Sequence, residues 1–435
     1  MTLFTNARLV DPASQYDGPG GLRIEDGVIA EVFRGQPTSM PTGSGDAIDC
    51  RGKVLSPGLI DARVFAGEPG ARHRESFRSA GASAAAGGVT TIVAQADTTP
   101  PLDDPALLQF ALERGRAAAP VRVTAMGALT RGLAGREMTE QQLLLDAGAV
   151  ALSDGDHPLA DTAVMRNVMT YATGTGALVV HHPQDAALSA KGCATSGEFA
   201  TRLGLPSVPA VAERIGLERD LALAEATGVR YHADILSTAG ALPALERAKA
   251  AGLSVSAGTT IHHLTLNEFD IGPYRSFFKL APPLRSEDDR RAIVEALASG
   301  LIDIVVSGHA PWDEEAKRLP FEEAEAGAVG LETLLPAMMR LVNEEALTML
   351  RFIEAASLAP ARLLGLPGGR LTAGAPADLV LFDPGAPFVL DRAALSSKSK
   401  NTPYDRTRME GRVIGTWVGG RCVNPAAEAM AAGSG

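Results

Sequence analysis

Eight short apolar or β-branched runs follow one another along the middle of the chain, and stretches of helical character separate them. The runs cover residues 59–65, 90–95, 122–129, 149–155, 177–182, 230–236, 254–260 and 303–309. Nearly continuous apolar strands that alternate with helices are typical of a parallel sheet covered by helices. Eight such units over about 310 residues favour a closed (β/α)₈ barrel over an open doubly wound sheet. The predicted fold class is therefore α/β, with a TIM-type barrel over residues 57–366.

Two helix starts in this region carry a recognisable polar spacing. Thr139 precedes Gln142 by three residues, and Ser286 precedes Asp289 by three residues. This is the spacing of a capping box, in which side chain and backbone satisfy each other's free groups at a helix start. The pattern predicts helices over 139–147 and 286–298.

The two ends of the chain differ from this middle part. Residues 1–56 and 367–424 contain short β runs that are separated by Asp-Gly and other glycine turns. Strands from both ends can pair with each other, so we expect one small β-sandwich domain with the barrel inserted between its halves. The small residues at 425–435 predict a frayed, disordered tail.

Composition excludes several classes of protein. The 435 residues can bury a sizeable core, and the net charge of -11 argues against nucleic acid or an anionic membrane as the main partner. Cys50, Cys193 and Cys422 lie far apart, which fits a reduced compartment better than a disulfide framework. The sequence has neither a secretion signal nor an apolar stretch of about 18 residues. We therefore expect a cytoplasmic protein.

One segment has the form of a metal-site signature without its ligands. Residues 57–70 read PGLIDARVFAGEPG. The segment resembles the dihydroorotase family, which runs Pro-Gly-Leu-Ile-Asp, then His-x-His, then a stretch ending Arg-Glu-Pro-Gly. Both flanks are kept, whereas Arg63 and Phe65 stand at the histidine positions and Gly67 stands at the arginine position. The resemblance to class I dihydroorotases covers nearly the whole chain, and it implies an amidohydrolase barrel.

The same resemblance implies further zinc ligands at the carboxyl ends of later strands. Asp154 matches the family's bridging acid, and His182 matches its histidine on strand five. Ile235 replaces the histidine of strand six, and Gly308 replaces the catalytic aspartate of strand eight. Four of six ligand positions are thus replaced, and zinc needs three or four ligands in a set geometry. We expect no catalytic residue, no metal and no other cofactor.

The positions that the family uses to grip the substrate carboxylate are changed as well. Besides Gly67, Asp97 stands where an asparagine is usual, and so does Ala281. An aspartate at position 97 would repel an anionic substrate. The resemblance therefore implies a site that does not bind dihydroorotate or carbamoyl aspartate.

These replacements lead to a structural hypothesis. An uncompensated buried carboxylate costs several kcal/mol, so a lost dication must be replaced by another positive charge. We expect Arg63 to form an ion pair with Asp154 or Asp61, while Phe65, Ile235 and Trp312 fill the vacated volume. The barrel mouth would then be plugged.

Plainer roles compete with this vestigial metal site. Asp61 and Asp154 can accept hydrogen bonds from loop backbone, as polar side chains at strand ends often do. His182 and His309 can be hydrogen-bonded residues of the barrel mouth, and residues 262–263 can be loop packing.

Three functions remain open. The resemblance implies a noncatalytic dihydroorotase homologue of pyrimidine biosynthesis, a structural partner of aspartate transcarbamoylase that forms a homodimer or hetero-oligomer. The second is an active zinc-dependent dihydroorotase or a hydantoinase- or allantoinase-like cyclic amidohydrolase. That enzyme would need zinc on Asp154, His182 and an unexpected third residue such as His157 or His309. The third is a barrel adapted to sensing a ligand.

Overall fold

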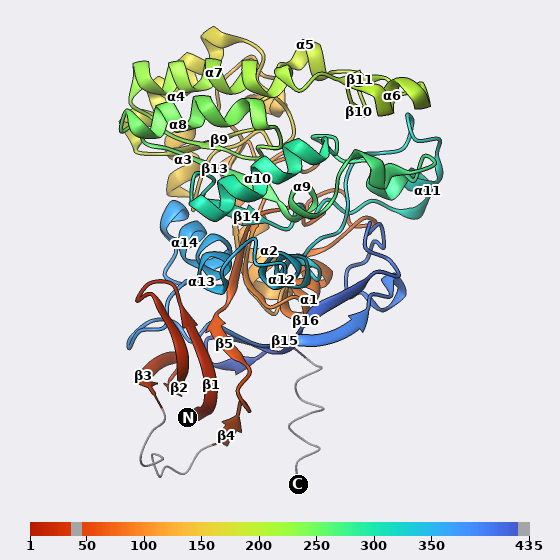
Figure 1. Ribbon diagram of the computed structural model, residues 1–435. Coiled ribbons are helices and arrows are strands. Elements are labelled where there is room, and N and C mark those ends of the chain that lie inside the picture. The colour runs from red at the N-terminus through yellow and green to blue at the C-terminus, as the bar shows by residue number, and fades with distance from the viewer. Residues whose placement is uncertain (36–45, 425–435) are drawn as a thin grey trace.

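The computed structural model describes residues 1–35 and 46–424, and the expected disordered tail at 425–435 lies outside these residues. A barrel with its helices forms one part, and a sheet built from both chain ends lies against it (Figure 1). Among the described residues, no helix combines the length and apolar character that a bilayer crossing requires.

The sheet at the chain ends has eight strands. They are β1 (Thr2–Asp11), β2 (Tyr16–Glu25), β3 (Val28–Arg34), β4 (Asp46–Asp49), β5 (Val54–Pro57), β15 (Leu379–Val389), β16 (Arg408–Val418) and β17 (Arg421–Cys422). Their order is β17-β16-β15-β5-β1-β2-β3, and β4 pairs with β1. Leu55 of β5 pairs with Leu9 on one side and with Leu381 on the other, so this strand joins the two ends of the chain. The rings of Phe4 and Trp417 meet edge to face at 4.9 Å in the core of this domain.

Seven of the eight predicted barrel runs form regular strands. They are β6 (Leu59–Val64), β7 (Val89–Ala94), β8 (Arg122–Ala125), β9 (Leu178–His181), β12 (Arg230–Ala233), β13 (Val255–Thr260) and β14 (Ile304–Val306). The run at 149–155 forms isolated bridges instead, in which Leu152 pairs with Gly127 and Val179. The amide of Phe65 donates to the carbonyl of His309 at 3.0 Å and closes the ring. The α/β fold class and the closed barrel are confirmed.

Helices cover the outside of the barrel (Figure 1). They are α1 (Phe77–Ala86), α2 (Pro105–Ala118), α3 (Gln141–Asp146), α4 (Thr162–Thr175), α7 (Val211–Thr227), α8 (Leu242–Ala250), α10 (Glu287–Ser299), α12 (Leu334–Asn343), α13 (Met349–Ile353) and α14 (Ala359–Leu364). Helix α4 illustrates why they form. Asp161 caps its first turn by accepting from the amide of Ala163 at 2.7 Å, and Gly176 ends it with φ of 72°. Its buried residues, Met165, Val168, Met169 and Ala172, recur at helical spacing and face the barrel.

The two predicted caps have different outcomes. Ser286 caps α10, since its hydroxyl accepts from the amide of Asp289 at 3.1 Å. The cap at Thr139 was wrong. Its hydroxyl donates to the carbonyl of Ala128 at 2.7 Å, and α3 begins at Gln141 without a side-chain cap. A buried threonine satisfied by a neighbouring loop is not free to cap a helix.

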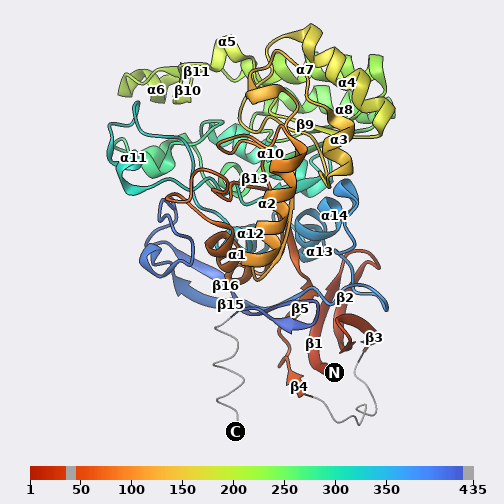
Figure 2. The same ribbon diagram turned by 180° about the vertical axis from the view of Figure 1, so that it is seen from behind.

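An arm extends from the barrel mouth. It consists of α5 (Ala186–Ser189), β10 (Ala194–Thr195), α6 (Glu198–Leu203) and β11 (Ser207–Val208), and β10 pairs with β11. Figures 1 and 2 both show β10, β11 and α6 at one side of the molecule, away from α4 and α8. The short helices α9 (Ile261–Thr265) and α11 (Glu314–Arg318) also belong to the loops of this end. The mouth is therefore surrounded by long βα segments, where barrels of this type place their functional residues.

Candidate functional site

Arg63 lies at the centre of the barrel mouth, at the end of β6. Its side chain is 3% exposed, and its Nε donates to Oδ2 of Asp234 at 2.6 Å. A second guanidinium nitrogen donates to Oδ1 of Asp156. Burial alone would lower the pKa of Arg63, but the charges of Asp156 and Asp234 outweigh it and raise the pKa above its usual value. The guanidinium is therefore a permanent cation, bound between carboxylates from two other segments of the mouth.

The partners of Arg63 differ from the expected ones. Asp154 accepts from the amides of Leu129 at 2.8 Å and Thr130 at 3.0 Å, and from the Thr130 hydroxyl at 2.5 Å. Asp61 accepts from the amide of Arg63 at 3.2 Å and from that of Ser307 at 3.3 Å. Both carboxylates are turned toward the backbone, so the predicted ion pair with either of them was wrong. Their positions agree with the plainer alternative, in which they order loops.

Burial raises the pKa of both of these carboxyl groups. Burial raises the pKa of Asp61 to about 6, against the hydrogen bonds that its carboxylate accepts. Burial also raises the pKa of Asp154, although the hydroxyl and amide of Thr130 act in the opposite direction.

Of the three side chains expected to fill the centre, Ile235 lines it, whereas Phe65 and Trp312 contact Arg74. Ile235 is buried, and the guanidinium of Arg74 lies 4.0 Å from the ring centroid of Phe65 and 3.3 Å from that of Trp312. The indole nitrogen of Trp312 donates to the carbonyl of Ala326 at 2.8 Å, which fixes the ring. The cavity that remains beside Arg63 and Ile235 has a volume of about 20 Å³. That is room for about one water molecule.

Two glycines at positions where the family resemblance implies functional residues have a left-handed backbone. Gly67 has φ of +69°, and a Cβ there would lie 2.2 Å from the carbonyl oxygen of Glu75. Gly308 has φ of +66°, and its Cβ would lie 3.1 Å from Cδ2 of His262. L side chains rarely adopt such φ values, so the loops at both positions have adapted to glycine. Neither position accepts the family's arginine or aspartate without a shift of the chain.

Asp97 and Ala281, at the two other positions that the resemblance implies for substrate binding, lie near this centre. Asp97 is half-buried, and a Cβ on Gly155 would lie 2.8 Å from its Cγ. Its Oδ1 has no hydrogen-bond partner, and burial together with the charge of Asp156 raises its pKa to about 6. Ala281 is exposed and lines the cavity beside Arg63.

The histidines of the mouth fall into two groups. His309 and His181 are held by hydrogen bonds, as the plainer alternative for His309 expected. Nδ1 of His309 accepts from the amide of Gly330 at 3.2 Å, and Nδ1 of His181 lies 2.6 Å from Asp220. His182 differs, because its Nδ1 is buried without a partner. Burial lowers the pKa of His182 to about 4, so its ring is neutral near pH 7.

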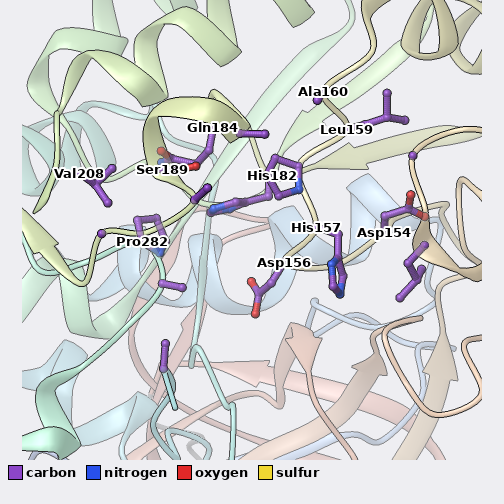
Figure 3. A pocket seen from close by; sticks show the side chains of 18 of the residues that line it. Asp154, Asp156, His157, Leu159, Ala160, His182, Gln184, Ser189, Val208 and Pro282 are labelled. Atoms are coloured by element: carbon purple, nitrogen blue, oxygen red, sulfur yellow. The ribbon is translucent and has the colours of Figure 1, made fainter. Parts of the chain in front are cut away.

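A pocket of about 680 Å³ opens beside this closed centre (Figure 3). His182 and Gln184 line it together with Asp156 and His157, which follow the fourth barrel run. Figure 3 shows Asp156 and His157 next to His182, with Val208 and Pro282 toward the arm. The mouth is therefore filled around Arg63, whereas the pocket next to it is open. The expected filling of the mouth is confined to the surroundings of Arg63.

Comparisons with known proteins agree with this architecture. The model of the dihydro-orotase-like family matches residues 52–240, and that of an amidohydrolase family matches residues 327–424. The dihydroorotase of Anaeromyxobacter dehalogenans strain 2CP-1 is 41% identical over 419 residues, which are 96% of each chain. This chain belongs to the dihydroorotase family. The dihydroorotase of Syntrophotalea carbinolica is 39% identical and is covered to 98% of its length.

Solved structures extend this dihydroorotase relationship to the amidohydrolase fold. The L-hydantoinase (dihydropyrimidinase) from Arthrobacter aurescens has a TM-score of 0.87 and 26% identity, covering 97% of this chain and 95% of its own. The dihydropyrimidinase from Brevibacillus agri has a TM-score of 0.84 at 20% identity, over 98% of this chain and 95% of its own, and shows the shared fold alone.

The residues of this dihydroorotase family member do not fit the zinc that the family resemblance implies. Among residues 1–35 and 46–424, no three or more His, Cys, Asp or Glu side chains are grouped so that they could hold a metal ion. Both carboxylate oxygens of Asp154 accept hydrogen bonds, from Leu129 and Thr130. The guanidinium of Arg63 already binds the carboxylates of Asp156 and Asp234. An added dication would have to displace a positive charge that is covalently attached to the chain.

Sequence reasoning missed four residues of the mouth. Asp156 and Asp234 hold Arg63, and Glu213 and Arg285 form a second buried pair with 3.7 Å between Nη2 and Oε2. Asp234 lies one residue from the replaced ligand position, and Asp156 lies two residues after Asp154. Their closeness to these positions in the sequence could have indicated that both aspartates lie in the mouth. Glu213 lies on α7 without any motif around it, so nothing local indicates its role.

Proposed function

We propose that this dihydroorotase family member is a noncatalytic homologue and a structural partner of aspartate transcarbamoylase in cytoplasmic pyrimidine biosynthesis. The observation that supports the proposal is the buried guanidinium of Arg63 on Asp234 and Asp156. This guanidinium can balance the negative charge of the two carboxylates. Unlike a metal ion, it has no open coordination position at which a water or a carbonyl could be activated.

Two further features support the loss of turnover. Position 308 offers no carboxylate to take or give a proton, since it is a glycine in a left-handed turn. The arginine that grips an anionic substrate is replaced by Gly67, and the nearby Asp97 carries an acid group of its own. An anionic cyclic amide would meet neither a general base nor its usual partner.

The scaffold is kept although the chemistry is lost. The ring of strands is closed through Phe65 and His309, and the loops of the mouth are fixed by buried polar contacts such as that of Asp154 with Thr130. A rigid barrel of this kind suits a role in assembly, as a homodimer or within a hetero-oligomer. The choice of aspartate transcarbamoylase as partner rests on the family resemblance.

The first experiment measures zinc per chain and dihydroorotate hydrolysis on one sample purified without chelator. The dihydroorotase from Anaeromyxobacter dehalogenans, 41% identical, serves as the positive control for turnover. We expect zinc far below one ion per chain and no hydrolysis. The protein is then mixed with aspartate transcarbamoylase and examined by sedimentation velocity, where a faster joint boundary is expected. Separate boundaries would contradict the partnership without affecting the loss of catalysis.

A second candidate is an active zinc-dependent dihydroorotase or a related hydantoinase- or allantoinase-like hydrolase of cyclic amides. The identity to relatives named dihydroorotase favours it. Of its suggested third ligands, His309 is already engaged with Gly330 and lies 3.4 Å from Glu75, whereas His157 is exposed beside Asp154. Nearly one zinc per chain together with turnover would select this candidate.

A further inference from the structure

A separate cavity of about 410 Å³ lies at the other end of the barrel, where the strands begin. Residues of β6, β7 and β8 line it together with Asp378, which precedes β15, and Val418, which ends β16. Figures 1 and 2 both show β15 and β16 at the end of the molecule away from the arm. Small-molecule sites often lie between domains and usually have volumes of roughly 300–1,000 Å³. The cavity therefore has the place and the size of a ligand site.

Two threonines face this cavity from strands of the barrel. Val93 and Met126 belong to the apolar cluster inside the barrel, and Thr91 and Thr124 stand two positions before them. Alternate side chains of a strand face the same side, so both threonines continue the inner face toward the strand starts. Within the described part of the chain, neither hydroxyl is engaged in a hydrogen bond, and neither oxygen is enclosed by protein atoms. Both hydroxyls are therefore free to donate to a ligand.

Arg122 presents a guanidinium of fixed orientation to the same cavity. Its Nε donates to Oδ2 of Asp378 at 2.6 Å, and its Nη2 donates to Oδ1 at 3.0 Å. Oδ1 also accepts from the amide of Gly419 at 2.7 Å, so both carboxylate oxygens are occupied. The third nitrogen, Nη1, has no partner among the described residues, and the side chain is 45% exposed. Nη1 is therefore an accessible donor on a well-ordered cation.

Arg116 adds a second cation to the lining. It is exposed in the last turn of α2, and no carboxylate of residues 1–35 and 46–424 forms an ion pair with it. Among the described residues that line the cavity, Arg116, Arg122 and Asp378 are the charged ones. Two guanidiniums against one carboxylate leave one positive charge in excess. Apart from the two threonines, the remaining lining is apolar and includes Ile60 and Leu366.

We propose that this cavity binds a small monocarboxylate with an apolar body. Its carboxylate would accept from the guanidiniums of Arg116 and Arg122 and from a threonine hydroxyl, since charge-assisted hydrogen bonds between guanidinium and carboxylate are strong. One negative charge balances the excess of the lining. The body would pack on Ile60, Leu366 and Val418, where burial of each CH₂ group favours binding. The inference does not depend on the role in assembly.

The test is titration calorimetry on the full chain with hexanoate. Hexylammonium has a similar aliphatic body and the opposite charge, and acetate has the same head group without the body. We expect hexanoate to bind at least about tenfold more tightly than either. No binding of hexanoate at millimolar concentration, or equally tight binding of hexylammonium or acetate, would overturn the proposal.

Variants locate the site. Arg116→Gln removes a charged donor from an exposed position without an ion pair in the described chain, so the Kd of hexanoate should rise about tenfold while the fold is kept. Arg136→Gln is the matched control, because Arg136 is also exposed but lines the pocket at the barrel mouth, and it should leave the Kd unchanged.

A double variant tests the hydroxyls. Thr91→Val with Thr124→Val preserves shape and removes both donors, so the Kd should again rise about tenfold. A Kd that rises in Arg136→Gln but not in Arg116→Gln would place hexanoate at the mouth and overturn the assignment. A Kd unchanged in all of these variants would also overturn it, because hexanoate would then bind elsewhere.

Discussion

Nε of Arg63 lies 2.6 Å from Oδ2 of Asp234, and these two side chains are 3% and 5% exposed. The pair joins β6 to the segment that follows β12, across the mouth of the barrel. In a protein interior, such a pair is bound tightly but is also costly to break, because each charge has given up its hydration. The mouth of this barrel is therefore organised around a cation that belongs to the chain.

Replacing this cation should destabilise the protein strongly. Arg63→Met keeps a long apolar stem but leaves Asp234 and Asp156 facing each other without compensation. We expect the free energy of unfolding to fall by about 3–5 kcal/mol. Urea denaturation followed by circular dichroism measures it.

The control for this variant is Arg131→Met. Arg131 is 52% exposed and contacts Glu137 and Glu140 at 3.5 and 3.4 Å, so its loss should cost no more than about 1 kcal/mol. Adding Asp234→Asn to Arg63→Met should restore part of the lost stability, since it removes one of the unpaired charges. Equal losses for Arg63→Met and Arg131→Met would contradict the central role of the pair.

The hydrogen bond between Thr130 and Asp154 should stabilise the folded protein. Thr130→Val preserves shape but removes the hydroxyl that donates to Asp154 and accepts from the amide of Gly135 at 3.0 Å. We expect a loss of about 1–3 kcal/mol in unfolding free energy. Thr170→Val tests the same change at an exposed helix position, where the hydroxyl donates to the carbonyl of Arg166, and should have little effect. A large gain in zinc affinity on Thr130→Val would contradict this prediction, because it would show that Asp154 binds zinc once Thr130 no longer donates to it.

Patterns along the chain predicted the barrel well, because the alternation of apolar strands and amphipathic helices is itself local. The burial of Arg63 could also be anticipated, since a lost dication demands a substitute charge. Its partners could not, because Asp156 and Asp234 lie 93 and 171 residues away. Which of several carboxylates turns inward depends on the competing backbone amides of each loop. Asp154 and Asp61 are satisfied by such amides and are therefore unavailable to Arg63.

Returning the family's aspartate to position 308 should not rebuild the metal site. The φ of +66° and the close approach to His262 and Thr260 make Gly308→Asp strained, and we expect a loss of about 1–3 kcal/mol. Gly176→Asp is the matched control, because Gly176 has φ of +72° but no neighbour within 4 Å. The difference between the two variants reports crowding alone. Zinc content should stay far below one ion per chain, and zinc uptake by Gly308→Asp would contradict the conclusion that Arg63 blocks the centre.

Buried histidines should make the protein less stable as the pH falls. Burial lowers the pKa of His182, His232 and His263 to about 4 and that of His262 to about 3. Between those values and about 6.5, the unfolded chain takes up protons at these rings that the folded chain does not. Each such group therefore lowers the unfolding free energy by about 1.4 kcal/mol per pH unit as the pH decreases.

Buried aspartates oppose this trend, and Asp154, whose pKa burial also raises, is one of them. Asp61 and Asp97 have pKa values raised to about 6, so the folded chain holds their protons between about pH 4 and 6 and gains stability as the pH falls. The four histidines outnumber these three aspartates, and the net loss is on the order of 1–3 kcal/mol per pH unit in this window. Urea denaturation at pH 7, 6 and 5 measures the slope.

A single variant isolates one histidine. His232→Asn offers a polar group to Ser256, whose hydroxyl lies 2.7 Å from Nδ1 of His232, but cannot take up a proton. The slope of unfolding free energy against pH should become shallower by about 1.4 kcal/mol per pH unit between pH 6.5 and 4. His73→Asn, at a side chain that is 66% exposed, should leave the slope unchanged. If both variants keep the original slope, His232 is not a source of the pH dependence, and its ring must protonate equally in the folded and unfolded chains.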